Sequence, residues 1–267
     1  MPVLARPAGD IYYQVTGSSG PPLLLTHGYG ATSAMFAGNL AALAVGHRVI
    51  TWDLRGHGRS EYPADRAAYS AANALADMAA LLAELGPDRA VLGGHSLGGF
   101  LSLDSALTFP ERVAALVLIG TGPGYRNDAA RDDWNRRAHV TAARLAARGL
   151  AGLAGSAELH SDEHRDATGL IHAATQTLTQ RDARVIDGLP RIAAPTLVIV
   201  GADDTPFLGA ADYMAGKIPG ARKVVIPGAG HAPNVSQPEA FNRAVTRFLA
   251  ELSALGEPRA ATPEARS

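Results

Sequence analysis

The chain has 267 residues, of which 47% are hydrophobic and 18% charged, and its 24 Lys and Arg residues oppose 25 Asp and Glu residues to give a net charge of −1. This length is sufficient to bury a large core in one α/β domain, with or without an insertion. The neutral charge balance offers no basic surface for nucleic acid, and the absence of cysteine excludes disulfides, a thiolate nucleophile and cysteine-ligated metals.

Short apolar segments alternate with helical segments along most of the chain. Residues 11–15 alternate in polarity, which is typical of an antiparallel edge strand. Buried strands are predicted from continuous apolar runs at residues 23–26, 47–52, 89–92, 113–119, 195–200 and 222–226. Helices are predicted at residues 70–86, 97–109 and 238–252. This order predicts an α/β fold with a mostly parallel central sheet and helices on both faces.

The alternation is interrupted once, between residues 122 and 190, where the sequence lacks strand patterns and is rich in Ala, Arg and Asp. We predict that residues 122–190 form a helical insertion that covers the site as a cap. The core domain then comprises residues 1–121 and 191–255. Residues 256–267 form a Pro- and Ala-rich tail without periodicity, which is predicted to be disordered.

A glycine-rich turn is predicted between a strand and a helix at Gly94-His95-Ser96-Leu97-Gly98-Gly99. A serine hydroxyl is a poor nucleophile unless the chain holds it exposed, a base takes its proton and hydrogen-bond donors face the developing oxyanion. A tight turn exposes Ser96, its glycine neighbours avoid clashes, and the helix N-terminus offers free N–H groups. The pattern therefore predicts that Ser96 is a catalytic nucleophile.

Two further loops carry a candidate acid and a candidate base. Asp203 and Asp204 follow the last but one predicted strand, and His231 follows the last one in a glycine-rich loop. Since the carboxyl ends of parallel strands meet at one edge of an open sheet, these loops should lie near Ser96. The chain order Ser, Asp, His is the order of nucleophile, acid and base expected for this architecture.

These motifs resemble those of the α/β-hydrolase family over nearly the whole chain apart from the tail. The resemblance is carried by four segments: His27-Gly28-Tyr29-Gly30, Asp53-Leu54-Arg55-Gly56-His57-Gly58-Arg59-Ser60, the turn at Ser96, and Gly230-His231 followed by Pro238-Glu239-Ala240-Phe241. It implies a catalytic triad of Ser96, Asp204 and His231, because the G-x-x-D pattern of the family selects Asp204 rather than Asp203. It also implies an oxyanion hole made by the backbone N–H groups of Tyr29 and Leu97.

The resemblance implies an enzyme that cleaves a small to medium carboxylic ester or lactone through an acyl-enzyme, with no cofactor or metal. Ser96 disfavours the dehalogenases and epoxide hydrolases of the family, which use Asp as nucleophile. Carbon–carbon bond hydrolases usually have Trp directly after the catalytic histidine, where this chain has Ala232. The alternatives are such a carbon–carbon bond hydrolase, a cofactor-free perhydrolase or haloperoxidase, and a weakly catalytic receptor for a small molecule.

Other polar residues near these motifs are expected to support the site rather than to react. His27 and His95 should hold their turns by hydrogen bonds. Asp53, Arg55 and His57 are interpreted as a turn that supports the loop below the site. These residues therefore stay outside the predicted catalytic set.

Three residues of the inserted segment are also of interest. His160 and His164 lie four residues apart, but no third ligand is evident, so both are expected to be solvated rather than to bind a metal. Trp134, with leucines nearby, is predicted to line the substrate pocket.

The expected location is the cytoplasm. The N-terminus lacks the apolar segment of a signal peptide, and the longest apolar runs are too short to span a bilayer. The sequence therefore predicts a protein that acts on a small molecule and contacts neither membrane nor nucleic acid.

Overall fold

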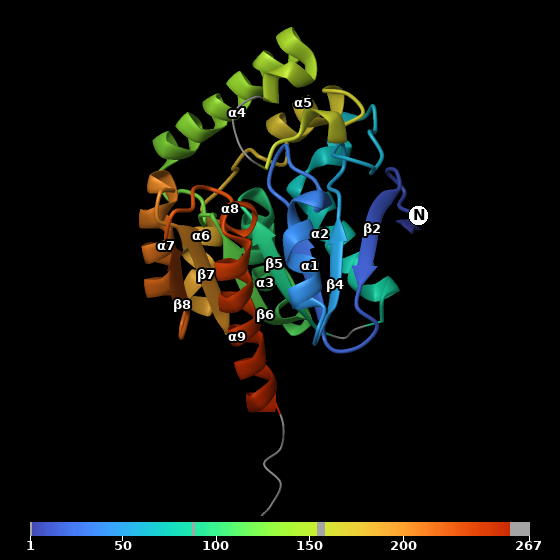
Figure 1. Ribbon diagram of the computed structural model, residues 1–267. Coiled ribbons are helices and arrows are strands. Elements are labelled where there is room, and N and C mark those ends of the chain that lie inside the picture. The colour runs from blue at the N-terminus through green and yellow to red at the C-terminus, as the bar shows by residue number, and fades with distance from the viewer. Residues whose placement is uncertain (1, 87–88, 154–157, 257–267) are drawn as a thin grey trace, which may run out of the picture.

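An eight-stranded sheet forms the centre of the protein (Figure 1). The computed structural model describes residues 2–86, 89–153 and 158–256. The sheet has the strand order β1-β2-β4-β3-β5-β6-β7-β8. Its strands are β1 (Val3–Leu4), β2 (Ile11–Thr16), β3 (Pro22–Thr26), β4 (Arg48–Trp52), β5 (Ala90–His95), β6 (Val113–Ile119), β7 (Thr196–Gly201) and β8 (Arg222–Ile226).

The sheet is parallel from β4 to β8, and only β1 and β2 are antiparallel to their neighbours. The predicted mostly parallel sheet is therefore confirmed, and so is the antiparallel direction of residues 11–15. These residues are not the edge of the sheet, however, because β1 pairs outside them with Tyr12 and Ile11. A two-residue strand is too short for its sequence to show a period.

Nine helices are present among the described residues. They are α1 (Ala37–Leu43), α2 (Ala71–Glu84), α3 (Leu97–Thr108), α4 (Asp128–Arg148), α5 (Thr168–Thr175), α6 (Arg184–Gly188), α7 (Thr205–Lys217), α8 (Pro233–Ser236) and α9 (Pro238–Gly256). Short 3₁₀ helices occur at Ser33–Phe36, Arg66–Tyr69, Pro110–Arg112, Gly149–Leu153, Ser161–Glu163 and Leu189–Arg191.

Helices cover both faces of the sheet. Successive side chains of each strand point to opposite sides, so each strand contributes residues to a core on either face. Leu24 of β3 packs in a core with α2, α3, α6 and α7. Its neighbours Leu23 and Leu25 pack in a second core with α1 and α9. The predicted helices on both faces are thereby confirmed, and the parallel strands are buried on both sides.

Helix α2 shows how local sequence sets the ends of an element. The Ser70 side chain accepts a hydrogen bond from the N–H of Asn73, as an N-cap does. Gly86, just past the helix, has φ +79°, which a residue with a side chain rarely adopts. Both predicted boundary residues therefore act at the ends of this helix.

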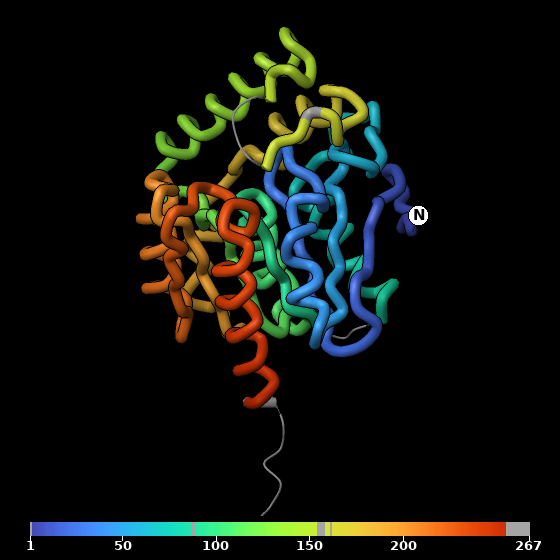
Figure 2. Tube along the Cα trace, in the orientation of Figure 1, coloured from blue at the N-terminus to red at the C-terminus, as the bar shows by residue number. Residues whose placement is uncertain are grey.

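The segment between β6 and β7 contains α4, α5 and α6 and no strand in the part that the structure describes. Helices α4 and α5 lie beyond the edge of the sheet at which β5 ends (Figures 1 and 2). Most of the predicted tail, residues 257–267, lies outside the described residues, and Gly256 is the last residue of α9. Within the described ranges, no helix combines the length and apolarity that a membrane crossing requires.

Candidate active site

Ser96 occupies a strained turn between β5 and α3. Its φ of +50° and ψ of −113° make it the one described residue other than glycine with positive φ. The backbone around it is tightly packed: a Cβ on Gly94 would lie 2.1 Å from the carbonyl carbon of Gly98, and a Cβ on Gly98 would lie 2.1 Å from the carbonyl oxygen of Thr26. Only glycine fits at these two positions, and backbone strain of this kind is frequent at functional sites.

Neighbouring backbone and side chains hold this turn in place. The N–H of Ser96 donates to the carbonyl of Ile119 at 2.9 Å. The hydroxyl of Thr121 donates to the carbonyl of Ser96 at 2.6 Å. Leu97 is the first residue of α3, where an N–H group has no acceptor within the helix. An oxygen atom near Ser96 could therefore accept a hydrogen bond from Leu97.

Asp204 and His231 form a hydrogen-bonded pair beside this turn. His231 Nδ1 lies 2.9 Å from Asp204 Oδ2, and the carboxylate side chain is only 5% exposed. Asp203 is exposed, so the structure brings Asp204 and not its neighbour to the histidine. With its Nδ1–H donated to the carboxylate, the neutral imidazole presents Nε2 as a proton acceptor.

The loop that carries His231 is held from three sides. The Nε2–H of His95 donates to the carbonyl of His231 at 3.1 Å, which agrees with the supporting role expected for His95. Gly120 has φ +50°, and a Cβ there would lie 2.4 Å from the same carbonyl oxygen. The ring of Phe207 packs on the imidazole with 4.7 Å between centroids. The side chains of Ser96 and His231 are not joined by a hydrogen bond in the described structure.

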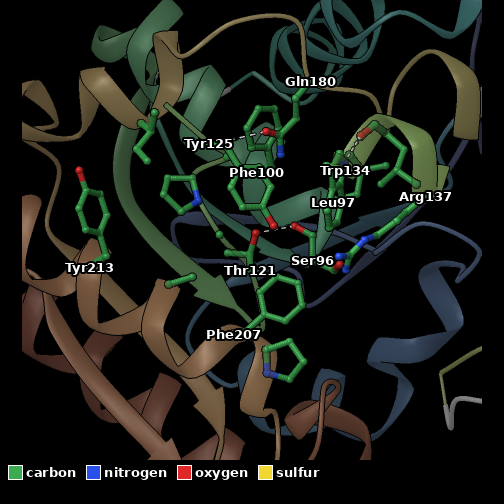
Figure 3. Close-up of a pocket in the computed structure, with 17 residues that line it drawn as sticks. Ser96, Leu97, Phe100, Thr121, Tyr125, Trp134, Arg137, Gln180, Phe207 and Tyr213 are labelled. Carbon is green, nitrogen blue, oxygen red and sulfur yellow. Dashed lines mark hydrogen bonds between the residues drawn. The ribbon is translucent and has the colours of Figure 1, made fainter. Parts of the chain in front are cut away.

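A cavity of about 370 Å³ opens in front of Ser96 (Figure 3). Leu97 and Phe100 of α3 line it from the core, and Phe207 lines it from α7. Trp134 of α4 lines it from the inserted segment, and its Nε1–H donates to the carbonyl of Leu178 at 2.8 Å. The cavity is large enough for a small organic molecule and mostly apolar.

Not all leucines of the inserted segment line the cavity in front of Ser96. Leu145 and Leu153 pack with Leu170 in a separate cluster, away from the cavity wall. Among the described leucines of this segment, Leu178 is the one that joins Trp134 in the wall. That leucines near Trp134 line the substrate pocket therefore stays a prediction for Leu178, while Leu145, Leu153 and Leu170 do not line this cavity.

Tyr29 lies in the loop after β3, but its side chain does not line the cavity. Its hydroxyl donates to the carbonyl of Leu170 in α5 at 2.9 Å. The preceding residue is packed against the turn at Ser96, since a Cβ on Gly28 would lie 3.2 Å from the Cβ of Ser96. The backbone of this loop, rather than the Tyr29 ring, is therefore the part that approaches Ser96.

Phe207 and Arg137 are among the cavity-lining residues that sequence reasoning missed. Phe207 lies three residues after Asp204 on the first turn of α7, and Arg137 lies three residues after Trp134 on α4. Residues three apart in a helix lie on one side of it, so this spacing would have placed Phe207 on the side of Asp204 and Arg137 on the side of Trp134.

His164 is buried, so the prediction that it is solvated is wrong. Its Nδ1 accepts a hydrogen bond from the N–H of Gly58 at 3.1 Å, and its Nε2–H donates to the carbonyl of Gly30 at 2.9 Å. It thereby joins the inserted segment to two loops of the core. His160 is exposed, as expected. Within the described residues, no group of three potential ligands is placed to hold a metal.

His27 and His57 are buried next to His164, and Asp53 supports the adjoining loop. The rings of His27 and His57 are 5.0 Å apart, and those of His57 and His164 are 5.8 Å apart. Asp53 accepts hydrogen bonds from the N–H groups of Ser33 at 2.7 Å and of Arg59 at 2.9 Å. These contacts agree with the supporting turn predicted below the site.

These buried histidines should make the protein less stable in acid. Burial lowers the pKa of His27 to about 4 from its usual 6.5, although the Asp53 carboxylate acts in the opposite direction. At a pH between about 4 and 6.5, His27 is protonated in the unfolded chain but not in the native chain. The free energy of unfolding therefore falls as the pH falls through this range. His27 alone should account for a loss of about 2 kcal/mol between about pH 7.5 and pH 5.

Urea unfolding across this pH range measures the effect. Burial also holds the pKa of His57 and of His95 well below the usual value, so these residues act in the same direction. In the variant His27→Gln the slope of stability against pH should be shallower. A free energy of unfolding that is the same at both ends of the range would contradict the prediction.

Comparison with known proteins identifies similar chains. A family model described as "Alpha/beta hydrolase family" matches residues 23–244. A protein of Variovorax paradoxus named "Putative carbamate hydrolase RutD" is 34% identical, over 93% of this chain and 99% of that protein. Pimeloyl-[acyl-carrier protein] methyl ester esterase of Nitrosomonas europaea is 32% identical, over 87% of this chain and 96% of that protein. The crystal structure of a hydrolase from Pseudomonas aeruginosa PA01 superposes with a TM-score of 0.79 at 31% identity, covering 93% of this chain and 97% of that chain.

Proposed function

The chain belongs to the alpha/beta hydrolase family, and from this premise we propose that it hydrolyses a small to medium carboxylic ester or lactone through an acyl-enzyme on Ser96. One observation carries the proposal. The strained Ser96 lies in the wall of a mostly apolar cavity, and Phe207 of the same wall packs on the imidazole of the Asp204–His231 pair.

In the proposed mechanism, His231 Nε2 takes the proton from Ser96 as the serine oxygen attacks the substrate carbonyl. Asp204 keeps the proton of the imidazole on Nδ1 and stabilises the imidazolium that forms. The backbone N–H groups of Leu97 and Tyr29 stabilise the tetrahedral oxyanion. His231 then returns the proton to the leaving group, and a water molecule activated by the same histidine releases the acid.

Proton transfer requires a hydrogen bond between Ser96 and His231 that the present structure does not contain. Such bonds are often long or misaligned before substrate binds, and they tighten in the complex. We expect the bond to form when a substrate carbonyl occupies the cavity.

The segment 122–190 acts in this proposal as a cap, while residues 1–121 and 191–255 form the core domain. Helix α4 supports the assignment, since its residue Trp134 closes part of the cavity wall opposite α3 and α7. The relatives named for carbamate and methyl ester hydrolysis cleave bonds between an acyl carbon and a heteroatom, which favours the same reaction type here.

A stopped-flow experiment with p-nitrophenyl esters of increasing acyl length tests the proposal. An acyl-enzyme predicts a burst of p-nitrophenol equal to the number of active sites, or steady turnover with an acyl length optimum. A parallel series of simple lactones separates the two substrate classes. A folded protein that releases no p-nitrophenol and opens no lactone would refute the proposal and favour the receptor alternative.

Trp134 is proposed to set the preference for acyl length, because its indole forms part of the apolar wall. In the variant Trp134→Ala the enlarged pocket should shift the optimum of the p-nitrophenyl ester series toward longer chains and change kcat/KM for the shortest ester about tenfold. The matched control is Val140→Ala, a change on the same helix at a side chain that is 68% exposed. An unchanged optimum in Trp134→Ala would remove this residue from the substrate pocket.

A further inference from the structure

One charged side chain lines the cavity that contains Ser96. Of the residues in this wall, all of them in the described part of the chain, Arg137 is the only one with a formal charge, and none is Asp or Glu. The remaining wall consists of apolar side chains, such as Phe100 and Phe207, and of uncharged polar ones. The cavity therefore presents one positive charge to a molecule bound in front of Ser96.

The helical spacing of α4 places Arg137 in the cavity wall, where its side chain is also exposed to solvent. Residues three apart lie on the same face of a helix, so Arg137 and Trp134 share the face that closes the cavity (Figure 3). Arg136, one residue earlier, lies on a different face and does not line the cavity. The two neighbouring arginines thus differ in their access to the bound molecule.

The positive charge of Arg137 is only partly neutralised by the protein. Asp133 is shared between two arginines, with its Oδ1 3.1 Å from Arg136 and its Oδ2 2.6 Å from Arg137. One carboxylate cannot neutralise two guanidinium groups. The side chains of Arg137 and Asp133 are 76% and 45% exposed, and exposed ion pairs of this kind are weak. A carboxylate from solution can therefore replace or join Asp133 at Arg137 with little loss.

We propose that the substrate of this enzyme carries a carboxylate at the end remote from the scissile carbonyl, and that Arg137 binds this carboxylate. The inference rests on the proposed function and narrows its substrate class. A planar guanidinium matches a carboxylate through two parallel N–H donors, which makes Arg the suitable residue for this task. The apolar remainder of the wall suits a methylene chain that joins the ester to the carboxylate. The class is therefore half-esters of dicarboxylic acids, or lactones that bear a carboxylate.

Monomethyl adipate and dimethyl adipate form the first pair of probes, because they share the acyl chain and differ in the charge at its far end. For the wild-type protein, kcat/KM for monomethyl adipate should exceed that for dimethyl adipate by about tenfold, mainly through KM. The preference should decrease as ionic strength rises, because salt screens exposed charges. In Arg137→Gln the ratio of the two values should fall to about one, and in Arg136→Gln it should stay as in the wild type.

A second measurement separates this inference from the proposed function. Calorimetric titration of both adipate esters into Ser96→Ala protein measures binding without turnover. Tighter binding of monomethyl adipate, lost when Arg137→Gln is added, would support the inference even if the wild type cleaved no ester. Equal binding and equal kcat/KM for the two esters would overturn it, and so would an equal loss of preference in Arg136→Gln.

Discussion

Replacement of Ser96 by alanine is expected to lower kcat for a p-nitrophenyl ester by about 10⁶-fold, because it removes the atom proposed to form the acyl-enzyme. Residual hydrolysis should remain, since the backbone N–H donors and the cavity are unchanged. The substitution also replaces one residue at φ +50° with another, so backbone strain at the turn persists and stability should change little. Steady-state kinetics and thermal unfolding of the two proteins together measure the effect.

Ser102→Ala is the matched control for this variant. Ser102 lies on α3, the helix that follows Ser96, is fully buried and donates one hydrogen bond to the carbonyl of Gly98 at 2.8 Å. Its loss should reduce stability by about 1 kcal/mol and leave kcat within a few-fold of the wild type. If Ser96→Ala kept the burst of p-nitrophenol, or if both variants lost activity equally, Ser96 would not be the nucleophile.

Several strands of the fold could be predicted because a short, continuous apolar run is typical of a strand that is buried on both faces of a sheet. The run 113–119 coincides with β6, and 222–226 coincides with β8. Strand β5, in contrast, extends to His95, well beyond the predicted end at residue 92. Its last residues include Gly93, where a Cβ would lie 2.6 Å from the side chain of Leu25 on β3. Glycine there reflects packing between strands, which a local sequence pattern does not show.

The candidate site could be predicted only in part, for a related reason. Ser96, Asp204 and His231 each follow a strand, so the topology of a parallel sheet brings their loops to one edge. The cavity wall depends instead on how the segment 122–190 docks on the core. That docking uses contacts such as the close approach of Gly56 and Gly169, where a Cβ on Gly169 would lie 2.4 Å from the Cα of Gly56.

His164 illustrates the same limit. Its four-residue spacing from His160 suggested a metal pair, and the lack of a third ligand led to the prediction that it is solvated. No local pattern marks a side chain that will lie between two glycine-rich loops of another part of the chain. The two hydrogen bonds that bury it end on Gly58 and Gly30, more than a hundred residues away in sequence. Long-range partners of this kind become visible only when the tertiary structure is known.

A buried ion pair below the site leads to the largest expected change in stability. Asp77 of α2 accepts two hydrogen bonds from Arg55, with Nε at 2.7 Å and Nη2 at 2.8 Å, and a third from Arg6 at 2.9 Å. The side chains of Asp77 and Arg55 are 1% and 6% exposed. Arg55 lies in the turn after β4, so the pair fixes this turn to α2.

In Asp77→Ala the guanidinium of Arg55 remains buried without its carboxylate, which should lower the free energy of unfolding by about 3–5 kcal/mol. Asp212→Ala removes the partner of Lys223 from an exposed pair and should cost less than about 1 kcal/mol. The double variant Arg55→Met/Asp77→Leu leaves no unpaired charge in the buried pair, so its stability should be closer to the wild type than that of Asp77→Ala. Urea unfolding of the wild type and the three variants at about pH 7.5 tests this prediction. Equal losses of unfolding free energy in Asp77→Ala and Asp212→Ala would contradict it, because they would show that water reaches Arg55.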